Sequence, residues 1–173
     1  MFPYEDYAGD DGIRRFSDIA KNFDFGKRLG RARFPESFIQ PYVISIDMDV
    51  PDDPEYVLAR YDDGNVILMI SSILSPDHIH STNAIVAESL YAPAGSIILP
   101  PGHYIFGDAY SDVGQHMLLV DLREDGGAYG SIHAWQRGHD PLGEGDNARG
   151  TAYLAPDLRS FLESLTTDKA ALL

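Results

Sequence analysis

The apolar residues of the chain follow two repeats, one typical of helices and one typical of strands. Helical spacing occurs near both ends of the chain, at Ile13, Phe16, Ile19, Ala20 and Phe23, and again at Leu158, Phe161, Leu162 and Leu165. The second group predicts a last helix over residues 156–165. Between these ends, a short helix is predicted to begin at Phe34-Pro35 and to end at Pro41, and another to span residues 83–91.

Strands are predicted between these helices, in antiparallel pairs. Residues 56–61 and 66–70 flank Asp62-Asp63-Gly64-Asn65, whose Asp-Gly step supplies the positive φ of a tight hairpin turn. Short strands are also predicted at 97–99, 104–106, 116–122 and 129–135, and residues 138–150 are predicted to form a loop. Hairpins with helices at both ends predict an α+β fold, an antiparallel twisted β-sheet with helices packed on one face.

The residues from Phe106 onward carry a series of short motifs in a definite order. A Gly107-Asp108 turn is followed by Gly114, an apolar strand over 118–122, the Gly126-Gly127 turn, a strand ending near Trp135 and the helical sequence Ser160-Phe161-Leu162-Glu163-Ser164-Leu165. This order resembles the SUKH superfamily, the Smi/Knr-type group of bacterial immunity proteins and regulators of fungal cell-wall synthesis. Upstream, residues 34–39 are similar to the family's entry helix, although Pro41-Tyr42 stands where members usually have an Asn-Gly-Gly turn.

The resemblance implies a fold, a domain organisation and a class of function. Residues 13–165 would form a single SUKH-like domain, with a flexible acidic arm at 1–12 and a C-terminal tail at 166–173. Such a protein would be a non-enzymatic protein-binding module. It would neutralise a cognate toxin of the nuclease or deaminase type by occlusion, or act as a regulatory protein.

Charge is distributed unevenly along the 173 residues. Residues 13–33 hold seven basic and two acidic side chains, a charge of +5, whereas residues 34–173 hold six basic and 21 acidic side chains, a charge of −15. A body this acidic repels nucleic acid and anionic lipid and attracts basic surfaces. We therefore expect a basic protein partner, a toxin domain, and neither nucleic acid nor a membrane. We also expect a cytoplasmic protein that is a monomer or a weak dimer; the lack of cysteine is compatible with a reducing compartment.

Acidic side chains concentrate in one stretch and on the hairpin that follows it. The predicted partner-binding residues are Asp47, Asp49, Asp52, Asp53, Glu55, Asp62 and Asp63, with Arg60 as the single base among them. Most charged runs are solvated loops, but acidic side chains this numerous, with a single base among them, repel one another unless a cationic partner is bound. Taken with the resemblance, the pattern favours an interface.

The histidines suggest an alternative function from another class. His78 and His80 would place both rings on one face if they lay on a strand, as in a cupin-like metal-dependent enzyme. The remaining histidines lie in different predicted elements, and His133 is expected on a solvated strand face opposite Trp135. No nucleophile elbow or phosphate-binding loop is present in the sequence. We therefore predict no catalytic residue, no metal site and no cofactor, and we expect Trp135 to be a core residue between the sheet and the last helix.

Overall fold

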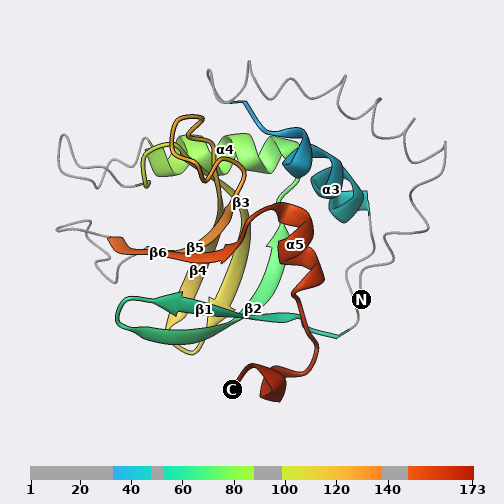
Figure 1. Ribbon diagram of the computed structural model, residues 1–173, viewed down its shortest axis with the longest axis vertical. Helices are drawn as coiled ribbons and strands as arrows, with labels where there is room; N and C mark the ends of the chain where they lie inside the picture. Colours follow the sequence, from blue (N-terminus) through green and yellow to red (C-terminus); the bar gives the residue numbers. More distant parts are fainter. Residues whose placement is uncertain (1–32, 48–52, 88–98, 138–147) are drawn as a thin grey trace.

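A six-stranded antiparallel sheet forms the centre of the molecule in the computed structural model, which describes residues 33–47, 53–87, 99–137 and 148–173. The strands are β1 (Tyr56–Tyr61), β2 (Gly64–Ile73), β3 (His103–Ser111), β4 (Gly114–Asp121), β5 (Ile132–Arg137) and β6 (Ala148–Ala155). They lie in the sheet in chain order. Because β1 and β6 approach each other, the sheet curls into a shape close to a barrel (Figure 1). The coarse prediction of an antiparallel α+β fold is confirmed.

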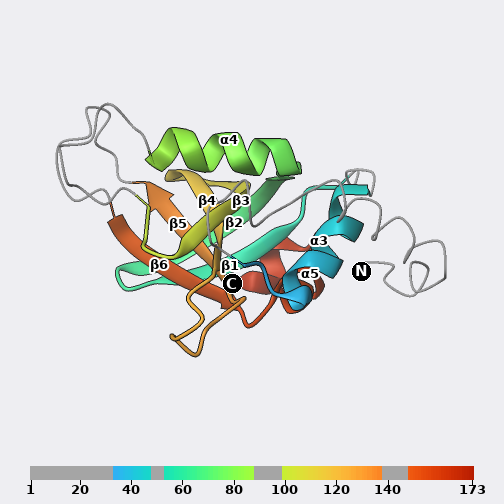
Figure 2. The same cartoon turned by 90° about the horizontal axis from the view of Figure 1, so that it is seen from above.

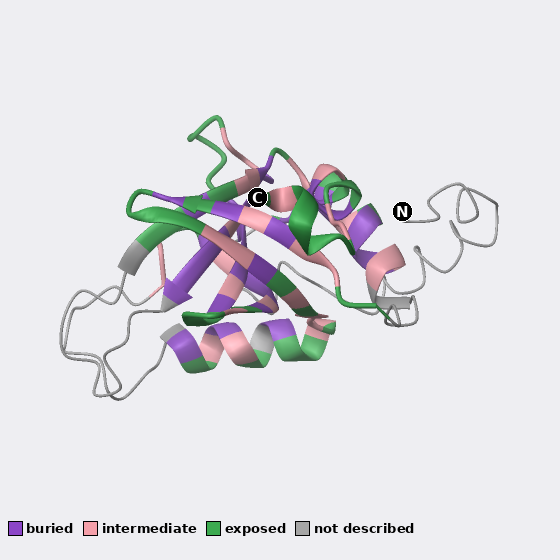
Figure 3. Ribbon diagram, turned by 90° about the horizontal axis from the view of Figure 1, so that it is seen from below, coloured by how far each residue is buried: buried purple, intermediate pink, exposed green. Residues whose placement is uncertain are grey.

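Helices lie on both sides of this sheet. They are α3 (Glu36–Asp47), α4 (Pro76–Ala87), α5 (Leu158–Glu163) and the 3₁₀ helix η2 (Lys169–Leu172). Figure 2 shows α4 on one side of the sheet and α3 and α5 together on the other. The buried positions of α4 face the sheet and its exposed positions face outward (Figure 3). The predicted placement of the helices on a single face is therefore not confirmed.

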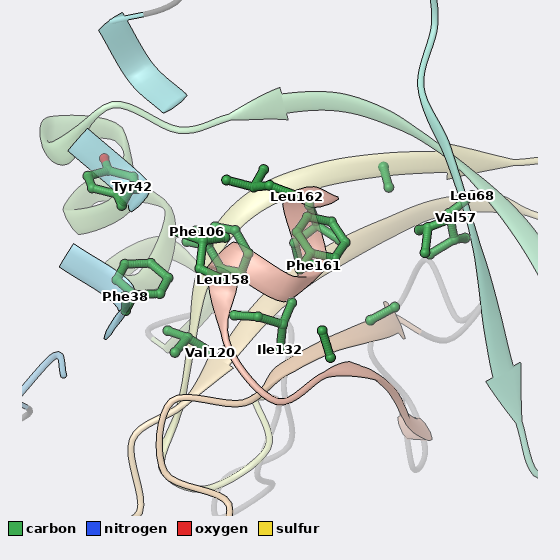
Figure 4. Close-up of a cluster of buried hydrophobic side chains, with 14 of the residues drawn as sticks. Phe38, Tyr42, Val57, Leu68, Phe106, Val120, Ile132, Leu158, Phe161 and Leu162 are labelled. Carbon is green, nitrogen blue, oxygen red and sulfur yellow. The ribbon is translucent and has the colours of Figure 1, made fainter. Parts of the chain in front are cut away.

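An aromatic chain fills the core between the sheet and helices α3 and α5 (Figure 4). The rings of Phe38 and Tyr42, one helical turn apart, stack with centroids 5.5 Å apart, and Phe38 meets Phe106 edge to face with centroids 5.3 Å apart. Phe106 in turn meets Phe161 of α5 edge to face at 6.5 Å. Burial of each such side chain contributes about 1.5–3 kcal/mol. The predicted buried face of the last helix is confirmed for Leu158, Phe161 and Leu162. The helix is shorter than the predicted 156–165, so Leu165 lies beyond its end and is only partly buried.

A second, smaller core lies on the α4 side of the sheet. It consists of Val86 from α4 and of Ile105, Leu119 and Trp135 from the sheet. Trp135 is completely buried, so its assignment to the core is confirmed. The helix that Trp135 faces is α4 and not the last helix, because α5 packs on the opposite side of the sheet.

Helix α3 continues past the proline that was predicted to end it. Pro41 lies inside the helix and cannot donate a hydrogen bond to the preceding turn, a loss of roughly 3 kcal/mol in a helix interior. The buried residues Phe38, Tyr42 and Val43 offset this loss by packing against the sheet. The Tyr42 hydroxyl also donates to the carbonyl oxygen of Leu74 at 2.6 Å. Tertiary packing thus overrides the local helix-breaking signal.

The predicted turn at Gly107-Asp108 is wrong, because both residues lie inside strand β3. Gly107 pairs with Ile73 of β2 and Leu118 of β4. A side chain at Gly107 would place its Cβ 2.7 Å from the carbonyl oxygen of Ser72. The glycine is therefore required by the close approach of strand β2, which no local pattern reveals.

Two further elements differ from the sequence prediction. Strand β6 occupies Ala148–Ala155, where only the end of a loop had been predicted, because alanine and glycine are poor strand formers and hide the pattern. Helix α4 begins at Pro76, seven residues earlier than predicted, with Pro76 in its first turn and Asp77 beside it. Leu99 lies outside any strand.

Two predicted strand pairings are confirmed, and several predicted segments lie outside the described residues. The β1–β2 hairpin and the antiparallel pairing of β4 with β5 are as predicted. The arm at 1–12, the helix at 13–23, Ile97, Ile98 and most of the loop at 138–150 lie outside the described residues. The C-terminal segment is attached to β1, because Thr166 and Tyr56 form a β-bridge. Within the described ranges, no helix is both long and apolar enough to cross a membrane.

Candidate functional site

Two histidines and an aspartate meet where three neighbouring strands run side by side. His103 is the first residue of β3 and pairs directly with Asp121, the last residue of β4. His133 lies on β5, one step along, opposite Leu119. One nitrogen or oxygen from each of the three side chains lies within 4.8 Å of the others, the only such group of potential metal ligands in the described part of the chain.

Arg123 holds the carboxylate of this cluster from the solvent side. The Arg123 backbone N–H and Nε each donate to Oδ1 of Asp121 at 2.9 Å, and an Arg123 terminal nitrogen donates to Oδ2 at 2.6 Å. Asp121 is completely buried, while the side chain of Arg123 is 47% exposed. Burial by itself would raise the pKa of Asp121, but the hydrogen bonds from Arg123 outweigh it and hold that pKa below its usual value. The carboxylate is therefore ionised at neutral pH.

Each histidine of the cluster has a partner on one ring nitrogen only. His103 Nδ1 lies 3.0 Å from the carbonyl oxygen of Pro101, and His133 Nε2 lies 2.8 Å from the hydroxyl of Ser131. The other two nitrogens, His103 Nε2 and His133 Nδ1, are buried without a hydrogen-bond partner. Burial lowers the pKa of His133 to about 4. His133 is therefore neutral at pH 7.

His133 was expected on a solvated face opposite Trp135, and this expectation is wrong. Residues two apart on a strand share a face, so His133 lies on the same buried side as Trp135. Its ring meets His103 edge to face at 5.2 Å and Tyr153 of β6 at 5.6 Å. The sequence signal for the cluster was present in the predicted strands that contain Asp121 and His133. Only the pairing of the strands, however, brings the residues together.

The predicted acidic residues fall into two separate groups. Asp53 is exposed and Glu55 is half-buried just before β1, and burial raises the pKa of Glu55. Asp62 and Asp63 are exposed at the far end of β1, where they form the two-residue turn to β2. Because β1 has six residues, about 20 Å of strand separates the two groups.

The rest of the acidic stretch is described in part or not at all. Asp47 is the last residue of α3, and the placement of its side chain is not described. Asp49 and Asp52 lie outside the described residues. Within the described chain, the acids therefore do not form one continuous patch.

The histidine pair of the alternative function lies on a helix and not on a strand. His78 and His80 both belong to α4. The metal-enzyme interpretation depends on the period of two that a strand provides, and a helix does not have this period. His78 is exposed and its Nδ1 lies 3.2 Å from the hydroxyl of Ser75.

Comparison with known proteins adds no assignment to this geometry. The chain matches no family model, and no curated protein and no solved structure is significantly similar to it.

Proposed function

We propose that the protein is a non-enzymatic, SUKH-like module that binds a basic toxin domain of the nuclease or deaminase type and neutralises it by occlusion. It would work as a monomer or weak dimer in the cytoplasm. The proposal is supported mainly by the adjacent pair Asp62 and Asp63, both exposed at the tip of the β1–β2 hairpin. Its wider basis is the acidic charge of residues 34–173 and the resemblance in motif order.

The β3–β4 turn extends this acidic tip. Tyr61, next to Asp62, forms a hydrogen bond of 2.8 Å between its hydroxyl and Nδ1 of His116, and His116 Nε2 lies 2.8 Å from the hydroxyl of Ser111. These contacts tie the end of β1 to the β3–β4 turn, where Asp112 is exposed. Acidic side chains from both turns therefore belong to one end of the sheet.

Exposed apolar side chains accompany the acid of the β3–β4 turn. Val113, next to Asp112, is 44% exposed, and Tyr110, the second-last residue of β3, is 43% exposed. We call Asp62, Asp63, Asp112, Tyr110 and Val113 the acidic end. Its composition suits an interface with an apolar centre and a charged rim. Acids in the rim would take the place of substrate phosphates on a basic toxin, and the apolar residues would hold the complex.

A charge reversal at the hairpin tip tests this proposal. Asp62→Lys together with Asp63→Lys should change the free energy of unfolding by about 0.5 kcal/mol or less, because exposed turn charges contribute little to stability. The same double variant should weaken partner binding by several kcal/mol, since it places like charges across the interface. Binding is measured by calorimetric titration against an inactive form of whichever basic toxin domain a neighbouring reading frame encodes.

The chain offers a matched control in Glu124 and Asp125. This pair is also adjacent, exposed and in a turn, between β4 and β5. Replacing both residues with lysine changes the net charge by the same amount as the hairpin variant. The comparison therefore distinguishes the effect of local contacts on binding from the effect of the net charge of the protein. Equal losses in the two double variants, or an adjacent reading frame whose basic product does not bind, would refute the acidic end as the interface.

A further inference from the structure

The cluster of His103, Asp121 and His133 contains two buried imidazole nitrogens that have no hydrogen-bond partner. A backbone carbonyl can only accept a hydrogen bond, so the 3.0 Å contact with Pro101 places a proton on Nδ1 of His103. In the neutral ring, Nε2 of His103 is then a bare acceptor. It is buried, has no hydrogen-bond partner and lies 3.8 Å from the carboxylate oxygen Oδ2 of Asp121. Oδ2 of Asp121 already accepts from Arg123 at 2.6 Å, but the imidazole nitrogen beside it has no partner, and a buried polar atom without a partner is costly.

His133 of β5 also has one ring nitrogen without a hydrogen-bond partner. Its Nε2 is engaged by the hydroxyl of Ser131, which leaves Nδ1 buried and without a hydrogen-bond partner. A proton on Nε2 of His103 would satisfy the contact with Asp121 but would leave Nδ1 of His133 unsatisfied. A single metal ion would satisfy both imidazoles and the carboxylate together. Pro101 and Ser131 then act as outer partners that fix the ring orientations, as is usual for metal-binding histidines.

From this arrangement we infer that His103, Asp121 and His133 bind one divalent transition-metal ion, with Zn²⁺ as the reference case. Two imidazole nitrogens and one carboxylate suit Zn²⁺ and its neighbours Co²⁺ and Ni²⁺ better than Ca²⁺ or Mg²⁺, which prefer oxygen ligands. Three protein ligands leave a fourth position for water or another ligand. This site would be additional to the proposed protein-binding function and does not depend on it.

The distances require only a small closure around the ion. Ligand atoms about 2.0–2.1 Å from a tetrahedral Zn²⁺ lie about 3.3 Å from one another. The 3.8 Å separation of His103 Nε2 and Asp121 Oδ2 is slightly larger, and the three ligand atoms all lie within 4.8 Å. Arg123 is the competing cation, and its exposed side chain has room to move away from Asp121.

Titration of the full-length, chelator-treated protein tests the inference. Zn²⁺ binding is followed by calorimetry, and Co²⁺ binding by its visible absorption, which reports coordination geometry. We expect one ion per chain and a Co²⁺ spectrum with nitrogen and oxygen ligands in four- or five-fold coordination. His133→Gln is the main variant because His133 is only partly buried. Loss of an outer partner costs about 10–100-fold in affinity, so loss of this ligand should cost about a hundredfold or more.

Two further variants make the result decisive. His78→Gln removes an exposed histidine on α4 outside the cluster and should leave Zn²⁺ affinity unchanged. Arg123→Gln removes the competing positive charge and should tighten Zn²⁺ binding by about tenfold. A wild-type protein that does not bind Zn²⁺, a His133→Gln protein that binds like wild type, or an equal loss in His78→Gln would each overturn the inference. Circular dichroism of the metal-free variants confirms that each one is folded.

Discussion

Trp135 illustrates how a single residue can be assigned to the core correctly and still face an unexpected neighbour. An indole in an apolar strand was expected to be buried, and it is fully buried. The strand alternates between the two sides of the sheet, with Ala134 in the core next to α5 and Trp135 in the core next to α4. Only the positions of the helices decide which of them covers each side.

Replacing the two large core aromatics should test both cores separately. Trp135→Ala and Phe161→Ala should each lower the free energy of unfolding by about 3–5 kcal/mol, because each leaves a cavity. Trp135→Phe should cost clearly less, since it keeps a ring and removes an indole N–H that is buried without a partner. Urea denaturation measures these changes, and Val113→Ala at an exposed turn serves as the control. An unchanged melting temperature in Trp135→Ala, with partner binding lost, would place Trp135 in an interface instead.

At the scale of an element, strand β3 depends on a glycine that the chain uses for close packing. The Cβ of an alanine at position 107 would meet a backbone oxygen of β2, and backbone cannot yield as a flexible side chain can. The same strand has a register shift between Ile105 and Gly107 in its pairing with β4. The sequence indicated a turn here because glycine followed by aspartate is a common turn signal.

Gly107→Ala should therefore destabilise the protein by about 1–3 kcal/mol, the usual cost of overpacking. Gly126→Ala is the matched control, because its added Cβ would meet only ordinary contacts, the nearest at 3.6 Å. Thermal unfolding of the two variants under one set of conditions gives the comparison. Equal melting temperatures for both variants would mean that β2 and β3 separate more easily than the packing at Ser72 indicates.

Across the whole molecule, charge affects association more than folding. Residues 34–173 carry 21 acidic and six basic side chains, and this excess creates a field that reaches beyond any single contact. The separation of the described acids into two groups means that the field is spread over the molecule, while the acidic end supplies the proposed local contacts.

The on-rate for a basic protein partner should consequently fall steeply with salt. Between low and high ionic strength we expect a decrease of about tenfold or more, because screening shortens the range of attraction from about 30 Å to a few ångströms. Stopped-flow measurement over a salt series gives this rate directly. The Asp62→Lys, Asp63→Lys protein should have a shallower salt dependence, and an on-rate that does not change with salt would contradict electrostatic steering.

Local patterns in the sequence determined those features that a short segment settles by itself. The Asp-Gly step and its flanking apolar residues predicted the β1–β2 hairpin, and helical spacing predicted the buried face of α5. Both depend on neighbours within a few residues, where periodicity and turn preference act directly. The antiparallel α+β class followed from the same signals.

Only the tertiary structure decided how distant segments meet. The cluster of His103, Asp121 and His133 depends on the register of three strands, and a shift of one residue would turn each side chain to the other face. Three further features likewise depend on which segments become neighbours. They are the formation of strand β6, the packing of Trp135 against α4 and the close approach of β2 to Gly107. The spacing of residues along the chain does not determine which segments become neighbours, because this depends on the packing of the whole sheet against its helices.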